Sequence, residues 1–275
     1  ALGEVRVGGE HLSEGQQMNQ LFRYLGVMDK INSRKMDEDF VDGLIFNGDP
    51  VIYKYAQGYD NFIRVMLSYF PEEEVAIRSF CDKIKKICKQ FPLYNLQAGA
   101  YSDSENAYET DTKAYLETLT TNKKLQSVLA GTNLLYAGQP DKTPLFVHAL
   151  IVNHYIESAW KFVDGGSQIA RYLAKEITSR GGKILKHVNV VKLKEEGGKV
   201  TYAETDKGER FYADTFISNV HPVKTVEMTE SNMFKNAYRS RLKSLDSTIS
   251  VFYANVVLKK NTFQYTRIED NLQIA

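Results

Sequence analysis

The sequence is poor in the residues that mark a secreted, disulfide-stabilised protein. It has only two cysteines, Cys81 and Cys88, in 275 residues. Their spacing of seven on a predicted helix places both thiols on one face, two turns apart along the axis, which is too far for a disulfide. We therefore expect two buried free thiols, as is typical of a reducing compartment.

Long apolar runs, a signal peptide and an excess of charge of one sign are also missing. No stretch approaches the roughly 20 apolar residues that cross a bilayer, and no segment has the features of a secretion signal. The formal net charge of +1 gives no reason to expect nucleic acid as a partner. A hydrophobic content of 43% with 25% charged residues is typical of a soluble globular protein of one large or two ordinary domains. We expect a cytoplasmic protein, and leave peripheral membrane contact and the oligomeric state open.

Histidine and cysteine are too sparse for an evident metal centre or nucleophilic triad. His148, His154 and Glu157 lie close together, but neither a cysteine nor a further histidine joins them. Without a cysteine or a further histidine as an additional ligand we reject a metal set at these residues, and we expect no metal. No Ser-His-Asp or Cys-His arrangement is supported either.

The first half of the chain is mostly helical by its apolar periodicity. The clearest helix follows Pro71, with three glutamates (72–74) in its first turn and lysines in its last turns, which complements the helix dipole. Its apolar stripe consists of Ile77, Phe80, Ile84, Ile87 and Phe91. The same periodicity predicts helices at 19–28, 60–70, 112–119 and 122–130, and the turn at 47–49 predicts a pair of strands within 44–55.

Residues 155–222 mix helical and strand patterns. Ser167 is a candidate cap for a helix with Ile169, Leu173 and Ile177 on one face. We expect this face to pack on strands at 187–193 and 214–218.

The rest of the second half adds a meander. A β-branched segment at 183–194 predicts a strand, and glycine turns near 197 and 208 predict two short antiparallel strands. A short strand at 216–218, a helix at 231–245 and a strand at 247–258 complete the pattern, which is α/β. On pattern alone, an ordinary α/β segment without any site stays open.

The residues between Gly131 and Pro222 carry a family resemblance. The elements that match are Gly165-Gly166, Val190 with Leu193, the turn at Gly208, and the stretch from Ala213 to Pro222. The chain resembles the phytoene desaturase-like flavoproteins, and residues 134–138 and 155–160 are most similar to the retinol saturase-like members. The resemblance extends from about Asn19 to about Asn255.

The resemblance implies an α/β (mixed α+β) fold in which part of a Rossmann-like FAD-binding domain is interleaved with a helical and β-sheet substrate or cap domain. Residues 1–160 would form the mostly helical cap, 161–222 a segment of the FAD-binding domain (helix, strand, β-meander, strand), and 223–275 would return to the cap.

The chain departs from the family at both ends. Family members open with a G-x-G-x-x-G loop that places FAD phosphates at a helix N-terminus, and they close with a glycine-rich segment over the flavin. Neither motif occurs in these 275 residues. We therefore expect an internal fragment that is inactive by itself and does not hold FAD tightly.

The resemblance also supplies candidate cofactor residues. Val190 matches a valine whose backbone reads the adenine edge of FAD, although a valine in a core strand is an equally good interpretation. Gly165 and Gly166 would let the backbone approach the flavin ring, or simply form a loop into a helix. Ser218 and Asn219 end a predicted strand, where a doubly wound sheet places its ligand crevice, but Asn219 is also a candidate cap before Pro222.

The catalytic residues are unknown at this level. His154 and Glu157 are weak candidates for acid–base roles, which would require one of them to face the isoalloxazine. The 17 tyrosines and 14 phenylalanines would suit either an apolar substrate tunnel or a generously packed core.

The resemblance thus implies a flavin-dependent oxidoreductase of the saturase or desaturase type, which moves hydride between FAD and an apolar, isoprenoid substrate such as a carotenoid or retinoid. Two alternatives stay open. One is a flavin-dependent polyene isomerase or amine oxidase-like enzyme, and the other is a non-catalytic module that binds an apolar ligand or a membrane surface.

Overall fold

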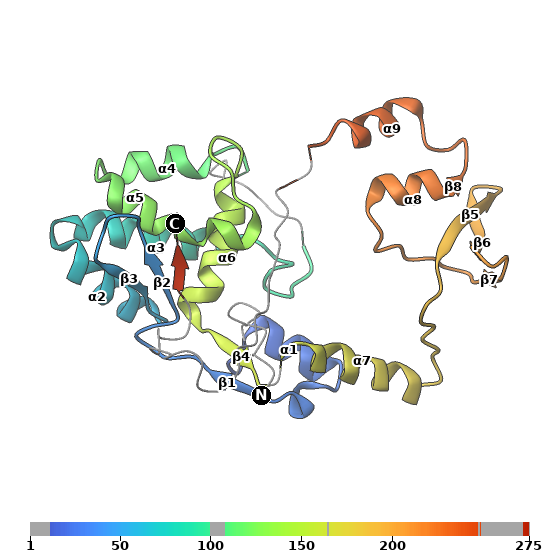
Figure 1. The fold of residues 1–275 in the computed structure, drawn as a ribbon, viewed down its shortest axis with the longest axis horizontal. Coiled ribbons are helices and arrows are strands. Elements are labelled where there is room, and N and C mark those ends of the chain that lie inside the picture. The colour runs from blue at the N-terminus through green and yellow to red at the C-terminus, as the bar shows by residue number, and fades with distance from the viewer. Residues whose placement is uncertain (1–11, 100–107, 164, 247, 249–271, 275) are drawn as a thin grey trace, which may run out of the picture. The chain divides into compact units, whose positions relative to one another are not determined.

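The computed structural model describes residues 12–99, 108–163, 165–246, 248 and 272–274. The chain divides into two compact units, which are treated separately below (Figure 1). The first unit consists of residues 1–180 with 252–275, and the second of residues 181–251.

The first unit is built mainly from helices. Its α-helices are α1 (Gln17–Tyr24), α2 (Tyr59–Tyr69), α3 (Glu74–Lys89), α4 (Thr112–Leu119), α5 (Lys123–Leu129), α6 (Leu145–Glu157) and α7 (Ser167–Ser179). Three short 3₁₀ helices lie between them: η1 (Met28–Lys30), η2 (Pro71–Glu73) and η3 (Gly131–Tyr136). The predicted helices of the first half are confirmed to within a few residues.

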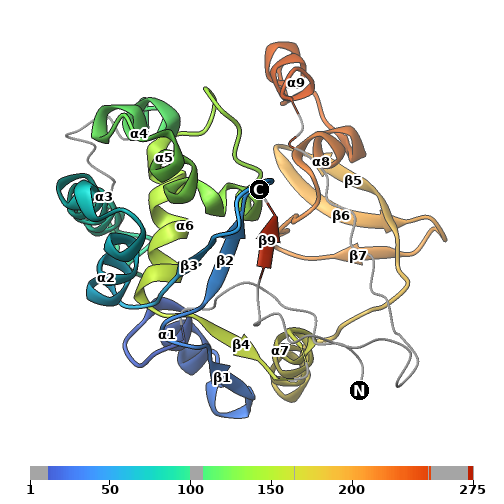
Figure 2. The ribbon, with the colours of Figure 1, turned by 60° about the vertical axis from the view of Figure 1, so that its left-hand side comes forward.

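Two small sheets complete the first unit. The antiparallel pair β2 (Asp42–Ile45) and β3 (Ile52–Tyr55) confirms the predicted strands around the turn at 47–49. Figure 2 shows β2 between β3 and β9 (Leu272–Ile274), which pairs with it in parallel. In the second sheet, β1 (Ser33–Lys35) pairs antiparallel with β4 (Trp160–Phe162).

The larger core of the first unit surrounds α3. Four members of the predicted stripe are confirmed, since Ile77, Phe80, Ile84 and Ile87 are buried, and α3 packs against α2 and α6. Phe91 lies beyond the end of α3 and is partly buried against the same core. Burial of this apolar surface is the main force that holds the helices together. Both cysteines are free and buried on this helix, and burial raises the pKa of each thiol to about 12.

A smaller core joins α1 to α7. Its fully buried members are Leu12, Phe22, Val27, Ile31 and Phe162. Ile169 and Leu173 on α7 pack against this cluster, while Ile177 is exposed. The helix is therefore confirmed, but the partner of its apolar face in the first unit is the α1 cluster. Ser167 does not cap the helix: it is the first helical residue, and Gly166 holds the N-cap position without a side-chain bond.

The second unit is a four-stranded sheet with two helices. The strands follow the order β7-β6-β5-β8, with β5 (Val190–Glu196), β6 (Lys199–Thr205), β7 (Arg210–Tyr212) and β8 (Thr229–Glu230). The predicted meander around the two glycine turns is confirmed. Helices α8 (Pro222–Met228) and α9 (Asn236–Lys243) follow, α9 being shorter than the predicted helix at 231–245.

Two strand predictions in this unit are wrong. Residues 183–189 are irregular, so the strand begins at Val190. Residues 216–218 form no strand, and Ile217 is 94% exposed, because no strand among the described residues of the second unit pairs with this short apolar run. The predicted strand at 247–258 lies almost entirely outside the described residues.

The fold class is confirmed in its broad form, because helices and small sheets are mixed along the chain. The Rossmann-like identity of the FAD-binding domain and the domain boundaries at 160 and 222 stay predictions. The compact units divide after Arg180, which lies inside the segment predicted for the FAD-binding domain.

Candidate functional site

The glycine loop before α7 has the geometry of a sharp turn. Gly165 is buried and has φ +89°, a conformation that residues with a Cβ rarely adopt. No atom lies within 4 Å of where a Cβ would be, so the space beside Gly165 is open within the chain. Gly166 has φ −72°, an ordinary value. Thus only Gly165 has a backbone conformation that favours glycine over other residues.

The buried side chain of Gln168 holds this loop in place. Its amide nitrogen lies 3.1 Å from the Gly165 carbonyl and 2.9 Å from the Val163 carbonyl. Its amide oxygen accepts from the Asn32 N–H at 2.7 Å. The loop is thereby tied to the segment that precedes β1. Glutamine is mostly a surface residue, so the sequence offers no signal for this role.

Val190 is the first residue of β5, opposite Thr205 on β6. The Asp206 N–H donates to the Asn189 carbonyl at 3.0 Å, which makes Val190 and Thr205 a pair that is not hydrogen-bonded to each other. The N–H and C=O of Val190 therefore point away from β6. On that side β8 pairs with β5 only at Leu193 and Lys194.

Ser218 and Asn219 lie on the exposed segment before α8. The Ser218 hydroxyl is 2.8 Å from the Thr225 hydroxyl and accepts from the Val220 N–H at 3.3 Å. The cap of α8 is His221, whose Nδ1 accepts from the Val223 N–H at 3.3 Å. Both interpretations of Asn219, a cap of the turn before Pro222 and a residue beside the cofactor, stay predictions.

His154 and Glu157 lie in the last turn of α6. The imidazole of His154 is partly buried and meets the Tyr94 ring edge-on, with the ring centroids 5.1 Å apart. Glu157 is exposed. After burial, its charge is the next cause of the raised pKa of Cys88.

A chain of polar side chains, of which Asn153 is buried and two tyrosines are half-buried, fixes this end of α6. The Tyr59 hydroxyl donates to the Asn153 Oδ1, and the Asn153 Nδ2 donates to the Tyr94 hydroxyl at 3.0 Å. Burial raises the pKa of both tyrosines well above their ordinary value. Both phenols are therefore neutral hydrogen-bonding groups rather than bases, and they position the helix that carries His154 and Glu157.

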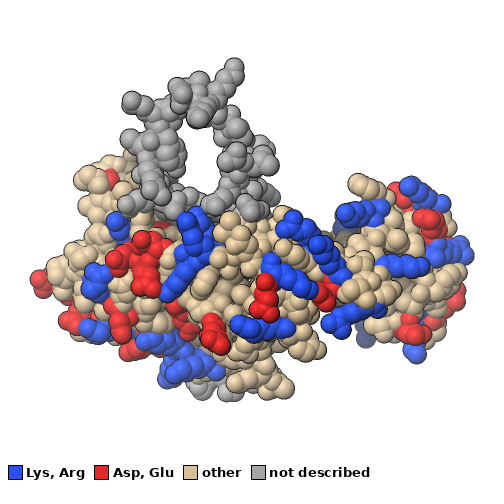
Figure 3. Space-filling model, turned by 90° about the horizontal axis from the view of Figure 1, so that it is seen from below, with Lys and Arg blue, Asp and Glu red and all other residues tan. Residues whose placement is uncertain are grey.

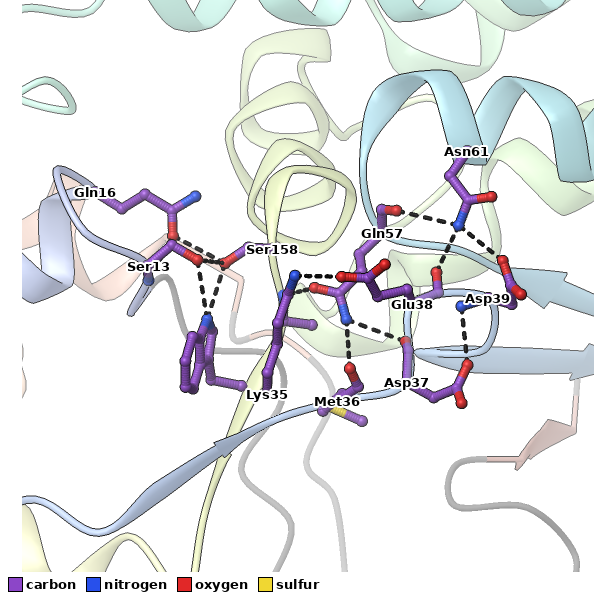
Figure 4. A network of polar contacts seen from close by, with 12 residues as sticks. Ser13, Gln16, Lys35, Met36, Asp37, Glu38, Asp39, Gln57, Asn61 and Ser158 are labelled. Carbon is purple, nitrogen blue, oxygen red and sulfur yellow. Dashed lines mark hydrogen bonds and ion pairs between the residues drawn. The ribbon is translucent and has the colours of Figure 1, made fainter.

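A second polar network links the ends of several segments of the first unit (Figure 4). The hydroxyls of Ser13 and Ser158 are 2.9 Å apart, and the Trp160 indole N–H lies 3.1 Å from each. Gln57 extends the network, since its amide accepts from the Ala159 N–H at 3.1 Å and donates to the Met36 carbonyl at 2.7 Å. These bonds fix where β4 begins, and β4 leads directly into the glycine loop.

The candidate residues divide between the two units. His154, Glu157, Gly165 and Gly166 belong to the first, whereas Val190, Ser218 and Asn219 belong to the second. Within the first unit, α6 leads through β4 to the glycine loop.

On the face shown in Figure 3, acidic and basic side chains are interspersed over both units.

Two further features bear on the kind of site. Among the residues that the structure describes, no three His, Cys, Asp or Glu side chains group in a way that could hold a metal ion. In the same residues, no helix has the length and apolar character that a bilayer crossing requires.

Comparison with known proteins gives three informative relatives. The chain is 25% identical over 235 residues to the all-trans-retinol 13,14-reductase of Rattus norvegicus, a match that covers 78% of the chain and 38% of that protein. The Danio rerio reductase is 29% identical over 155 residues, 49% of the chain and 25% of that protein. The chloroplastic prolycopene isomerase 1 of an Oncidium hybrid cultivar is 26% identical over 188 residues, 62% of the chain and 32% of that protein.

These matches confirm the predicted resemblance to the phytoene desaturase-like and retinol saturase-like flavoproteins. No protein-family model matches the chain. The chain spans about a third of the length of the curated relatives that it matches.

Proposed function

We propose that this chain is part of an FAD-dependent oxidoreductase that acts on an apolar, isoprenoid substrate by hydride transfer. The observation that carries the proposal is the joint similarity to a retinol reductase and a prolycopene isomerase. Both names describe enzymes of conjugated isoprenoid polyenes, one changing a double bond by reduction and the other by isomerisation. An ancestor that bound such a polyene beside a flavin accounts for both activities.

The residues of this chain are compatible with parts of an FAD site. The outward N–H and C=O of Val190 would present one donor and one acceptor, which suits the edge of an adenine. The open space beside Gly165 would admit a planar ring close to the backbone. Because no G-x-G-x-x-G loop occurs in these residues, the diphosphate site would come from elsewhere, and we expect this chain alone to bind FAD weakly.

When bound, the flavin supplies the hydride chemistry. The chain would then position the reactants and exclude water from them. Gln168 holds the glycine loop at one place, and the polar chain through Asn153 holds the end of α6. His154 and Glu157 would act in proton transfer only if one of them faced the ring, so their role stays a proposal.

The test requires the full-length protein. It should purify with flavin near one equivalent, and anaerobic incubation of its reduced form with all-trans-retinol should yield a product with two more hydrogens. A colourless protein that takes up no FAD on reconstitution would overturn the proposal.

The prolycopene isomerase matches favour a second candidate, a flavin-dependent isomerase of polyenes. Product mass separates the two functions: isomerisation leaves the mass of the polyene unchanged, whereas saturation adds two hydrogens. Incubation with prolycopene and with all-trans-retinol in parallel therefore decides between them.

A further inference from the structure

The first unit contains a cavity of about 310 Å³ that the cofactor candidates do not line. It lies between α4, α5, η3 and the loop at 137–143 (Figure 1). Leu116, Ala130 and Pro140 contribute apolar walls. Since an apolar cavity of about 150 Å³ can hold a benzene molecule, this one has room for an aliphatic side chain such as that of leucine.

The loop at 137–143 is a fixed wall of this cavity. The Gln139 N–H donates to the Thr143 hydroxyl at 2.8 Å, and the Thr143 N–H donates to the Gln139 carbonyl at 3.2 Å. Ala137 and Asp141 have φ of +56° and +59°, a region that residues with a Cβ enter only at a cost in free energy. Because the loop is already held in this conformation, a group that enters the cavity does not have to order it first.

Two exposed leucines lie beside the cavity. Asn133 and Tyr136 are three residues apart in η3, which places them on one face of a 3₁₀ helix, and both line the cavity. Leu134 and Leu135 lie between them in the sequence, do not line the cavity, and are 57% and 41% exposed. A single exposed leucine needs no explanation, but two adjacent ones at the edge of an apolar cavity form a candidate docking surface.

The charges around the cavity suit a second copy of this chain as the partner. Lys113 lies 3.2 Å from the carboxylate of Asp141, and Lys123 lies 3.1 Å from that of Glu117. These four side chains at the rim balance, with two charges of each sign. A rim of one sign would repel an identical rim, whereas a balanced rim can face its own copy without net repulsion.

We propose that this surface joins two copies of the chain about a two-fold axis, with Leu134 of each copy in the cavity of the other and Leu135 against its rim. A two-fold interface needs a patch that is complementary to itself. This patch meets that need, because it carries both an apolar cavity and, next to it, the apolar side chains that could fill one. The proposal goes beyond the proposed function and does not depend on it.

Sedimentation velocity of the full-length protein tests the proposal. Between about 1 and 100 µM, which covers weak to moderate affinities, the parent should shift from monomer to dimer. Leu134→Asp places a carboxylate at both cavities and should raise the dimer Kd at least about 100-fold, because two leucine side chains lose their burial. The control is Leu93→Asp, which changes another exposed leucine of the first unit and should leave the Kd unchanged. A parent that stays monomeric, or a Kd that both variants change equally, would overturn the proposal.

A second variant acts on the cavity instead of the leucine. Ser127 lines the cavity from α5, so Ser127→Phe should fill it and raise the dimer Kd about as much as Leu134→Asp does. Its control is Ser179→Phe, because both serines are exposed on a helix and bond a preceding backbone carbonyl. The control should dimerise as the parent does, and a Ser127→Phe protein with the Kd of the parent would refute the role of the cavity.

A mixture of the two weakened variants separates loss of docking from damage to the fold. In a mixed dimer, Leu134 of the Ser127→Phe copy can still enter the open cavity of the Leu134→Asp copy, so one of the two contacts remains. The mixed dimer should therefore form about 10-fold more tightly than either variant forms with itself. One variant carries a fused fluorescent protein, so that its sedimentation is followed at the absorbance of the fusion. A misfolded variant could not restore association, and a mixture that associates no better than either variant alone would refute the contact.

Discussion

The side chain of Gln168 binds both backbone groups of Asn32, with its amide oxygen 2.7 Å from the Asn32 nitrogen and its amide nitrogen 3.1 Å from the Asn32 oxygen. This two-point contact ties α7 to the strand entry at β1, across 136 residues of sequence. The same amide holds the Gly165 carbonyl. One buried glutamine therefore orders the glycine loop, the start of α7 and the segment before β1.

Replacement of this glutamine should destabilise the first unit. Gln168→Leu keeps the size but leaves the Asn32 backbone groups and loop carbonyls without partners, at about 1–3 kcal/mol for each group that water cannot reach. Urea unfolding of the chain measures the loss. The exposed Gln97→Leu is the control and should stay within about 0.5 kcal/mol of the parent. A loss no greater than that of the control would mean that the contact is not structural.

The two glycines of the loop should respond differently to alanine. Gly165→Ala places a Cβ on a residue with φ +89°, and with no atom within 4 Å the cost is backbone strain alone, about 1–2 kcal/mol. Gly166→Ala keeps an ordinary φ of −72° and should cost clearly less. Urea unfolding of the pair checks the order. Equal costs would show that the loop relaxes around the left-handed residue.

Features that depend on local sequence are the ones that could be predicted. The stripe of α3, with acidic residues first and basic residues last, belongs to a single helix, and the turn at 47–49 joins strands only a few residues apart. The sequence predicted the apolar face of α7 but not the residues that pack on it. Periodicity shows that one face of a helix is buried, and it does not show which residues bury that face. Leu173 therefore packs on the α1 cluster, of which Leu12, Phe22, Val27 and Ile31 lie over 140 residues earlier.

The candidate site was less predictable, for two physical reasons. A strand needs a partner, and the apolar run around Ile217 has none among the described residues of its unit, so the strand that its composition predicts does not form. Backbone direction depends on strand register, so the outward N–H of Val190 follows from its pairing with Thr205 and could not be read from residue types. The role of Gln168 depends equally on a long-range contact, its bonds to Asn32.

The buried imidazole of His148 should make stability depend on pH. Burial lowers its pKa from 6.5 to about 4, although the Leu129 carbonyl opposes this in part. Between these values the unfolded chain binds a proton that the folded chain does not, so stability falls as pH drops from about 6.5 towards 4, by at most about 1.4 kcal/mol per pH unit.

The measurement is urea unfolding at several pH values from 4 to 7. His148→Gln should flatten the slope between pH 4 and 6.5, because the group that gains the proton on unfolding is gone. The exposed His187→Gln serves as the control and should leave the slope unchanged. A slope in His148→Gln equal to that of the parent would assign the acid sensitivity to carboxylates instead.

The last prediction concerns the backbone of Val190 in the full-length protein. Its N–H points away from β6 and is not needed for the β5–β6 ladder, so proline here, at the first residue of a strand, should cost the fold little. If that N–H reads the adenine of FAD, Val190→Pro should nonetheless reduce the flavin content severalfold, because proline has no N–H to donate. Val190→Ile keeps the N–H and should retain the flavin of the parent.

Arg210→Pro, at the first residue of the edge strand β7, controls for proline in the same sheet. Flavin content from absorbance and melting temperature of the apo form are measured together. Loss of flavin in Val190→Pro alone, with both proline variants melting alike, supports the adenine contact, and equal flavin in the two proline variants refutes it.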